Sequence, residues 1–105
     1  MSYLAFLQDA IRHHYGCEAK HLETVPITER FQGRTVWDGK VEVFQLVNYL
    51  TAEKLFAWGY DDPESEQNLN AITILAQPPT VTPEQAVRAY IANQYRMGKD
   101  ATNAS

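Results

Sequence analysis

The chain has 105 residues, of which 45% are hydrophobic and 21% are charged, and this fits one compact globular domain and excludes a largely disordered chain. Its 13 acidic and 9 basic residues give a formal net charge of −4. Because a negative chain repels the phosphates of nucleic acids and of anionic lipids, we expect no nucleic-acid partner and no membrane partner.

The first predicted element is an amphipathic helix from Tyr3 to Tyr15. Apolar residues recur there at three- and four-residue steps, and polar residues occupy the other side. Ser2 can cap its N-terminus. Gly16 can end the helix in the left-handed conformation, which glycine adopts without a steric penalty.

Beyond Gly16, and as far as the Pro78-Pro79 pair, the apolar residues follow the two-residue period of β-strands. We expect three or four antiparallel strands within the segments rich in β-branched and aromatic residues, which are residues 22–31, 35–47, 55–60 and 71–76. Residues 60–70 are acidic, contain Pro63 and lack periodicity, so we expect an exposed loop there.

Two positions compete for the turn of the first hairpin. Asp38-Gly39 matches the two-residue turn that needs positive φ at both central residues, and we expect the turn there, with Val36 opposite Val41. The alternative places the turn at Gln32-Gly33 and makes Asp38-Gly39 a bulge inside one long strand, which would increase the local twist.

A second helix is predicted to begin at Thr82, which can cap it, with Pro83 at the first helical position and Gln85 at the third. We expect this helix to end at Gly98 and a flexible tail to follow over residues 99–105. The domain then spans residues 1–98.

The order of helix, antiparallel strands and helix predicts an α+β fold. We expect the N-terminal and C-terminal helices to pack on one face of the sheet. The other face would be left to solvent, a ligand or another subunit.

Aromatic residues on or beside the strands support the leading functional hypothesis. Phe56, Trp58 and Tyr60 alternate along one segment, so they share one sheet face, while Leu55 and Ala57 share the other. Under the helices these aromatics would be core, and on an open face they would form an apolar interface. The candidate partner-binding residues are Trp37, Tyr49, Trp58 and Tyr60. We therefore expect an interaction or self-association module that binds a protein partner or forms a homodimer through the open face or an edge of the sheet.

The alternative hypothesis is a small enzyme or metal-binding protein. His13, Cys17 and His21 could supply two imidazoles and a thiolate to a metal, and Asp9, four positions before His13, could orient that imidazole. This spacing fits no common zinc pattern. At the end of a helix, moreover, the helix dipole disfavours a thiolate at Cys17. We therefore assign no catalytic residue and no cofactor.

A single cysteine cannot form an internal disulfide, the N-terminus has no charged region of a secretion signal, and no apolar stretch approaches the ~20 residues that span a bilayer. We expect a cytoplasmic protein. The residues Thr35-Val36-Trp37, Gly39, Val41-Glu42-Val43-Phe44 and Ala57-Trp58 form a pattern that resembles short uncharacterised bacterial proteins. The likeness covers the chain from about His21 to the last helix. It implies a bacterial, cytoplasmic protein and brings no activity and no catalytic residue.

Overall fold

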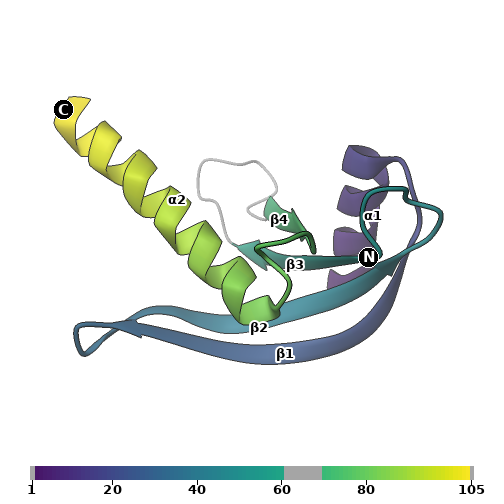
Figure 1. Cartoon of the computed structure of the whole chain (residues 1–105), viewed down its shortest axis with the longest axis horizontal. Helices are drawn as coiled ribbons and strands as arrows, with labels where there is room; N and C mark the ends of the chain where they lie inside the picture. The colour runs from purple at the N-terminus through teal and green to yellow at the C-terminus, as the bar shows by residue number, and fades with distance from the viewer. Residues whose placement is uncertain (1, 61–69, 105) are drawn as a thin grey trace.

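The computed structural model describes residues 2–60 and 70–104, with the side chains of residues 2–60 and 70–94. Its elements are, in order, α1 (Tyr3–Tyr15), β1 (Ala19–Phe31), β2 (Arg34–Leu46), β3 (Lys54–Tyr60), β4 (Asn70–Leu75) and α2 (Pro83–Ala104). The strands form one antiparallel sheet in the order β1-β2-β3-β4 (Figure 1). The α+β fold is therefore confirmed, with four strands. Residues 61–69, which make up most of the loop expected over residues 60–70, lie outside the described residues.

Both helices begin where their capping residues predict. The hydroxyl oxygen of Ser2 accepts a hydrogen bond from the Ala5 N–H at 3.1 Å, and Gly16 ends α1 with a φ of 68°. At α2 the Thr82 hydroxyl accepts from the Gln85 N–H at 3.2 Å, while the Gln85 side-chain oxygen accepts from the Thr82 N–H at 3.1 Å. This reciprocal capping box satisfies backbone donors that the first turn leaves without helical partners.

The expected end of the second helix at Gly98 is wrong, because α2 continues to Ala104 and includes residues that we expected in a flexible tail. A single glycine costs a helix only about 1 kcal/mol, and the alanines at 101 and 104 are strong helix formers. Within the part of the chain that the structure describes, no helix is long and apolar enough to cross a membrane.

The turn of the first hairpin lies at Gln32-Gly33 and not at Asp38-Gly39. Gln32 and Gly33 have φ values of 52° and 77°, as a two-residue turn that twists with its strands requires. Asp38 and Gly39 lie inside β2, opposite Thr28 and Ile27. The leading prediction of the turn is therefore wrong, and the alternative turn is correct. The alternative placed a bulge at Asp38-Gly39, but the bulge lies at residue 36, two residues before Asp38, because Glu29 pairs with Trp37 and Arg30 pairs with Thr35.

The correct turn follows from the side chains that it brings together. With the turn at Gln32-Gly33, Val25 pairs with Val41, and both join one hydrophobic cluster that also holds Ile27 and Val43. A turn at Asp38-Gly39 would have paired Val36 with Val41, yet Val36 is exposed near the hairpin tip. Packing across the whole hairpin thus outweighs the local preference of the Asp-Gly dipeptide.

The two helices cover opposite faces of the sheet, so the expectation that they share one face is wrong. Leu55 and Ala57 pack in a cluster with Leu7 and Ile11 of α1. Phe56 and Trp58 pack in a second cluster with Ala86 and Val87 of α2. Since neighbouring residues of a strand point to opposite faces, the alternation predicted for this segment is confirmed, and each face has its own helix. We call these the α1 face and the α2 face.

A bulge at Leu22 changes which residues of β1 point to each face. His21 pairs with Phe44, but Glu23 pairs with Val43, so Leu22 is the extra residue. The bulge shifts the alternation by one position. As a result His21 and Thr24, three residues apart, both point to the α1 face, where each contacts the same carboxylate of β2.

Candidate functional site

The sheet opens between β2 and β3. The two strands pair only from Gln45 opposite Lys54 to Glu42 opposite Ala57. Beyond that point β2 continues beside β1, and β3 continues beside β4. Figure 1 shows the β1–β2 hairpin running on past the shorter β3–β4 pair. The two central strands of the sheet therefore diverge and leave a gap between them.

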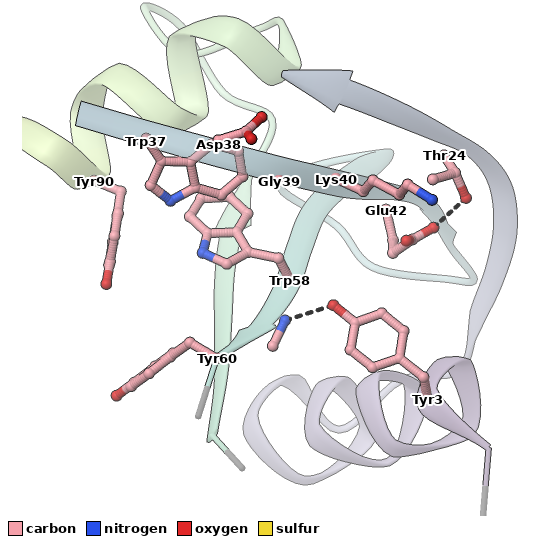
Figure 2. A pocket seen from close by; sticks show the side chains of 11 residues that line it. Tyr3, Thr24, Trp37, Asp38, Gly39, Lys40, Glu42, Trp58, Tyr60 and Tyr90 are labelled. Carbon is pink, nitrogen blue, oxygen red and sulfur yellow. Dashed lines mark hydrogen bonds between the residues drawn. The ribbon is translucent and has the colours of Figure 1, made fainter. Parts of the chain in front are cut away.

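Backbone groups of both strands point into this gap. The Leu46 N–H donates to the Glu53 carbonyl at 2.8 Å, so alternate residues of β2 before Leu46, including Lys40, turn their N–H and C=O toward β3. A continued ladder would place Lys40 opposite Gly59. Instead, the Gly59 N–H donates to the hydroxyl of Tyr3 at 2.7 Å (Figure 2). Tyr3, from α1, thus takes the bond that a further strand pair would have made. Among residues 2–60 and 70–104, Lys40 has no strand partner on this side.

The gap holds a cavity of about 680 Å³, which we call the β2–β3 cleft. This volume lies within the range of about 300–1,000 Å³ that is common for ligand sites. The side chains that line it come from both helices and three strands. They are the aromatic residues Tyr3, Trp37, Trp58, Tyr60 and Tyr90 and the polar residues Thr24, Asp38, Lys40 and Glu42.

The aromatic wall of the cleft lies on the α2 face. Trp58 is 3% exposed and meets Trp37 and Tyr90 edge to face, with ring centroids 5.4 Å and 5.3 Å apart. A Cβ atom at Gly39 would lie 3.1 Å from the Trp37 ring, so a glycine lets this ring lie close over the strand. Burial, and then the neighbouring Tyr60, raise the pKa of Tyr90. Tyr90 is therefore neutral near pH 7, and its ring completes an uncharged wall.

The polar side of the cleft centres on Glu42, a carboxylate that is only 4% exposed. Its Oε1 accepts a short hydrogen bond from the Thr24 hydroxyl and lies 2.9 Å from Nε2 of His21. The Thr24 hydroxyl also lies 3.4 Å from the same Nε2. A histidine that relays a proton from a hydroxyl to a carboxylate uses its two different ring nitrogens. Here both groups lie at one nitrogen, so the geometry is that of a hydrogen-bonded buried acid and not of a nucleophile relay.

The cleft brings together three of the four predicted partner-binding residues, Trp37, Trp58 and Tyr60. Tyr60 is 40% exposed, whereas Trp58 is core. Tyr49 lies elsewhere, packed against the α1 cluster with its ring 5.8 Å from that of Tyr15.

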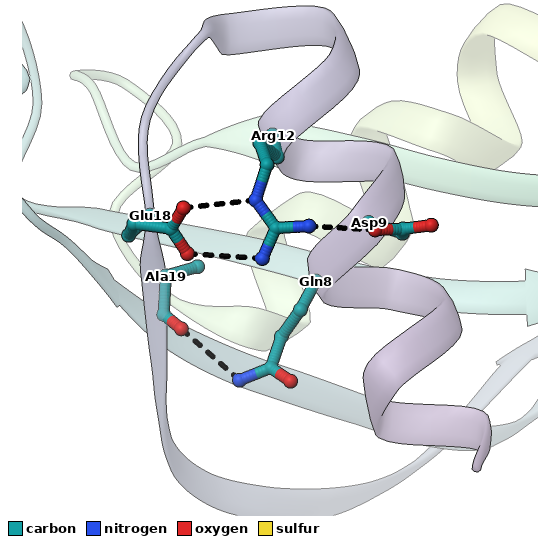
Figure 3. A network of polar contacts seen from close by, with 5 residues as sticks. All are labelled: Gln8, Asp9, Arg12, Glu18 and Ala19. Carbon is teal, nitrogen blue, oxygen red and sulfur yellow. Dashed lines mark hydrogen bonds and ion pairs between the residues drawn. The ribbon is translucent and has the colours of Figure 1, made fainter. Parts of the chain in front are cut away.

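Asp9 is held by an arginine of its own helix. Arg12 donates to Asp9 at 2.6 Å and also makes two bonds to Glu18, at 2.8 Å from Nε and 3.0 Å from Nη2 (Figure 3). The hydrogen bond from Arg12, followed by its charge, lowers the pKa of Glu18. Next to this network Gln8 donates to the carbonyl of Ala19 at 3.0 Å. The network fastens the end of α1 to the start of β1, and Asp9 serves this structural role.

The three residues proposed as metal ligands have different surroundings. His13 is exposed on α1, Cys17 is partly buried against the α1 cluster, and His21 contacts Glu42. Burial raises the pKa of the Cys17 thiol, which disfavours the thiolate that a metal or a nucleophilic role requires. Across residues 2–60 and 70–94, no group of three or more His, Cys, Asp and Glu side chains could hold a metal ion.

Sequence reasoning missed Tyr3, Tyr90 and Glu42 as parts of the site. Tyr3 and Tyr90 belong to the two helices, at opposite ends of the sequence, and no spacing rule connects them. Glu42 carried no signal either, because a carboxylate that alternates with Val41 and Val43 is typical of the solvent side of a strand. Its burial follows from the contacts with Thr24 and His21 that the fold brings to it.

No family model matches this sequence, and neither the curated proteins nor the solved structures contain a match to the chain. The resemblance to short bacterial proteins therefore stays a prediction.

Proposed function

We propose that the protein is a small interaction module that binds an extended polypeptide segment in the β2–β3 cleft. The observation that carries the proposal is the interrupted ladder: Lys40 turns its backbone groups toward a strand that no longer pairs with it. Unpaired N–H and C=O groups of a strand are a template for another extended chain, which gains affinity from main-chain hydrogen bonds.

The side chains around this strand edge support a protein partner. Tyr3 and Tyr60 are partly exposed at the cleft, beside the buried Trp58 and the half-buried Trp37. Tyrosine and tryptophan in well-packed pockets contribute much of the binding energy at protein interfaces. Of the side chains that the structure describes, two carboxylates and one cation line the cleft, which disfavours a phosphate backbone or an anionic lipid surface. A cytoplasmic site of action, expected from the sequence, is part of this proposal.

The proposal is tested by selecting peptides from a random seven-residue phage-display library on the intact protein. Binding of the selected peptides is then measured to the variants Lys40→Pro and Lys40→Ala. Both variants lose the lysine side chain, but only proline removes the N–H that points into the cleft. The N–H of residue 40 points toward β3 and away from β1, so proline there removes no bond donated to β1.

We expect the selected peptides to shift amide NMR signals around residues 38–42 and 58–60 and to bind Lys40→Ala. Their affinity for Lys40→Pro should fall by roughly tenfold, which corresponds to one lost main-chain hydrogen bond of about 1.4 kcal/mol. Circular dichroism confirms that both variants are folded. Equal binding to the two variants, or selected peptides whose shifts lie outside the cleft, would contradict the proposal.

A further inference from the structure

We infer that the cleft binds the tip of the β1–β2 hairpin of a second copy of this chain, where Arg30 and Phe31 at the end of β1 supply the extended segment. This inference rests on the proposed function and names the partner. The hairpin tip, residues 30–34, consists of Arg30, Phe31, Gln32, Gly33 and Arg34. Phe31 is 65% exposed, and the two arginines of the tip are also exposed. An exposed aromatic ring flanked by two arginines is the kind of side-chain set that supplies anchors at protein interfaces.

The charges of the tip and the cleft are complementary. Residues 30–37 contain two arginines and no acidic residue. The nearest carboxylate, Glu29, already accepts a hydrogen bond from Arg88 of α2 at 2.5 Å, so the tip keeps its positive charge. Among the described residues that line the cleft, the charged side chains are Asp38, the buried Glu42 and Lys40. A guanidinium can bind a carboxylate through two hydrogen bonds and also stack on aromatic rings, and the cleft offers both.

The geometry of the hairpin excludes an intramolecular contact. Gly33 in the turn and Lys40 in β2 lie seven residues apart, a separation of about 23 Å at 3.3 Å per residue. Because β2 is paired with β1 along this length, the strand cannot fold back to bring its own tip to its own cleft. Two copies related by a two-fold axis can exchange tips, with each tip in the cleft of the other copy, and this closes the assembly as a dimer.

The experiment measures association of the full chain by sedimentation velocity from micromolar to millimolar concentration. The tip variants are Arg34→Ala and Phe31→Ala, and the cleft variant is Lys40→Pro with Lys40→Ala as its control. Leu50→Ala is the control for Phe31→Ala, because Leu50 is 99% exposed and lies outside both the tip and the cleft. Thermal unfolding by circular dichroism confirms that each variant is folded. If Phe31→Ala does not fold, Arg34→Ala still tests the tip.

We expect the wild-type chain to dimerise and each tip or cleft variant to weaken the dimer by roughly 10- to 100-fold, because a symmetric dimer loses two contacts for one substitution. A mixture of Arg34→Ala with Lys40→Pro should associate more tightly than either variant alone. Its mixed dimer keeps one intact tip in one intact cleft, whereas each variant alone keeps none.

Three results would overturn the inference: a wild-type monomer at millimolar concentration, a dimer that the tip variants leave unchanged, or a mixture no tighter than its components. Failure of the inference remains distinct from failure of the proposed function. If the chain is monomeric but library peptides still bind in the cleft, the cleft binds extended segments and the tip is not its partner. If the chain is monomeric and no peptide binds there, both fail.

Discussion

The substitution Thr24→Val tests the hydrogen bonds of the buried acid in the cleft. Valine keeps the shape of threonine and suits a strand, so the substitution removes little besides the hydroxyl donor to Glu42. The Glu42 side chain is 5% exposed, and in the variant its carboxylate keeps the contact with His21 but loses the bond from residue 24. A hydrogen bond to a charged group contributes about 1.5–3 kcal/mol. We therefore expect the free energy of unfolding to fall by about 2 kcal/mol.

For a chain of 105 residues, a loss of about 2 kcal/mol lowers the melting temperature by about 9 °C. The assay is urea unfolding at pH 7 with thermal unfolding beside it. Thr28→Val is the matched control, since Thr28 lies on the same strand and donates at 2.9 Å to Asp38, its own cross-strand partner. Asp38 is exposed, so water can replace that hydroxyl, and the control should change stability by less than about 0.5 kcal/mol. Equal effects of the two substitutions would refute the reasoning.

Three further predictions concern the core, the turn and the thiol. Leu55→Ala should cost about 2–5 kcal/mol in urea unfolding, because Leu55 is 0% exposed, whereas Leu50→Ala should change stability by less than about 0.5 kcal/mol; similar losses would contradict the packing described. Gln32→Asn should raise the melting temperature, with a gain of about 0.5 kcal/mol, since asparagine tolerates the positive φ at this position better; Asp38→Asn should not, and a gain at position 38 alone would point to a turn there. Cys17 should react with iodoacetamide at pH 8 more slowly than in the urea-unfolded chain, because its raised pKa leaves less thiolate; an equal or faster rate in the folded protein would reject the burial of this thiol.

The elements that sequence reasoning predicted correctly are those fixed by local chemistry. Ser2, Gly16 and the Thr82–Gln85 capping box mark helix ends through bonds within a few residues. Alternation along β3 assigned Leu55 and Phe56 to opposite faces. Such features depend on residues that are close together in the sequence, so they can be predicted from one sequence.

The errors concern choices between two locally acceptable structures. Asp38-Gly39 and Gln32-Gly33 can both turn a hairpin, and the choice depends on which valines meet under α2. In the same way, nothing near α2 in the sequence says which face of the sheet it covers. The strand aromatics of the site were found from their pattern, but the cleft also depends on where the β2–β3 ladder stops, which the twist of the assembled sheet decides.

Because β3 belongs to both hydrophobic clusters, it links the stability of the two halves of the domain. All four residues from Leu55 to Trp58 are buried, alternately under α1 and under α2. If either helix detaches, it exposes one side of a strand whose other side still packs against the second helix. The domain should therefore melt in one cooperative transition, and the amide protons of β3 should be among the slowest to exchange with solvent. A partner that binds in the cleft beside this strand, next to Tyr3 of α1 and Tyr90 of α2, would then stabilise both helices together.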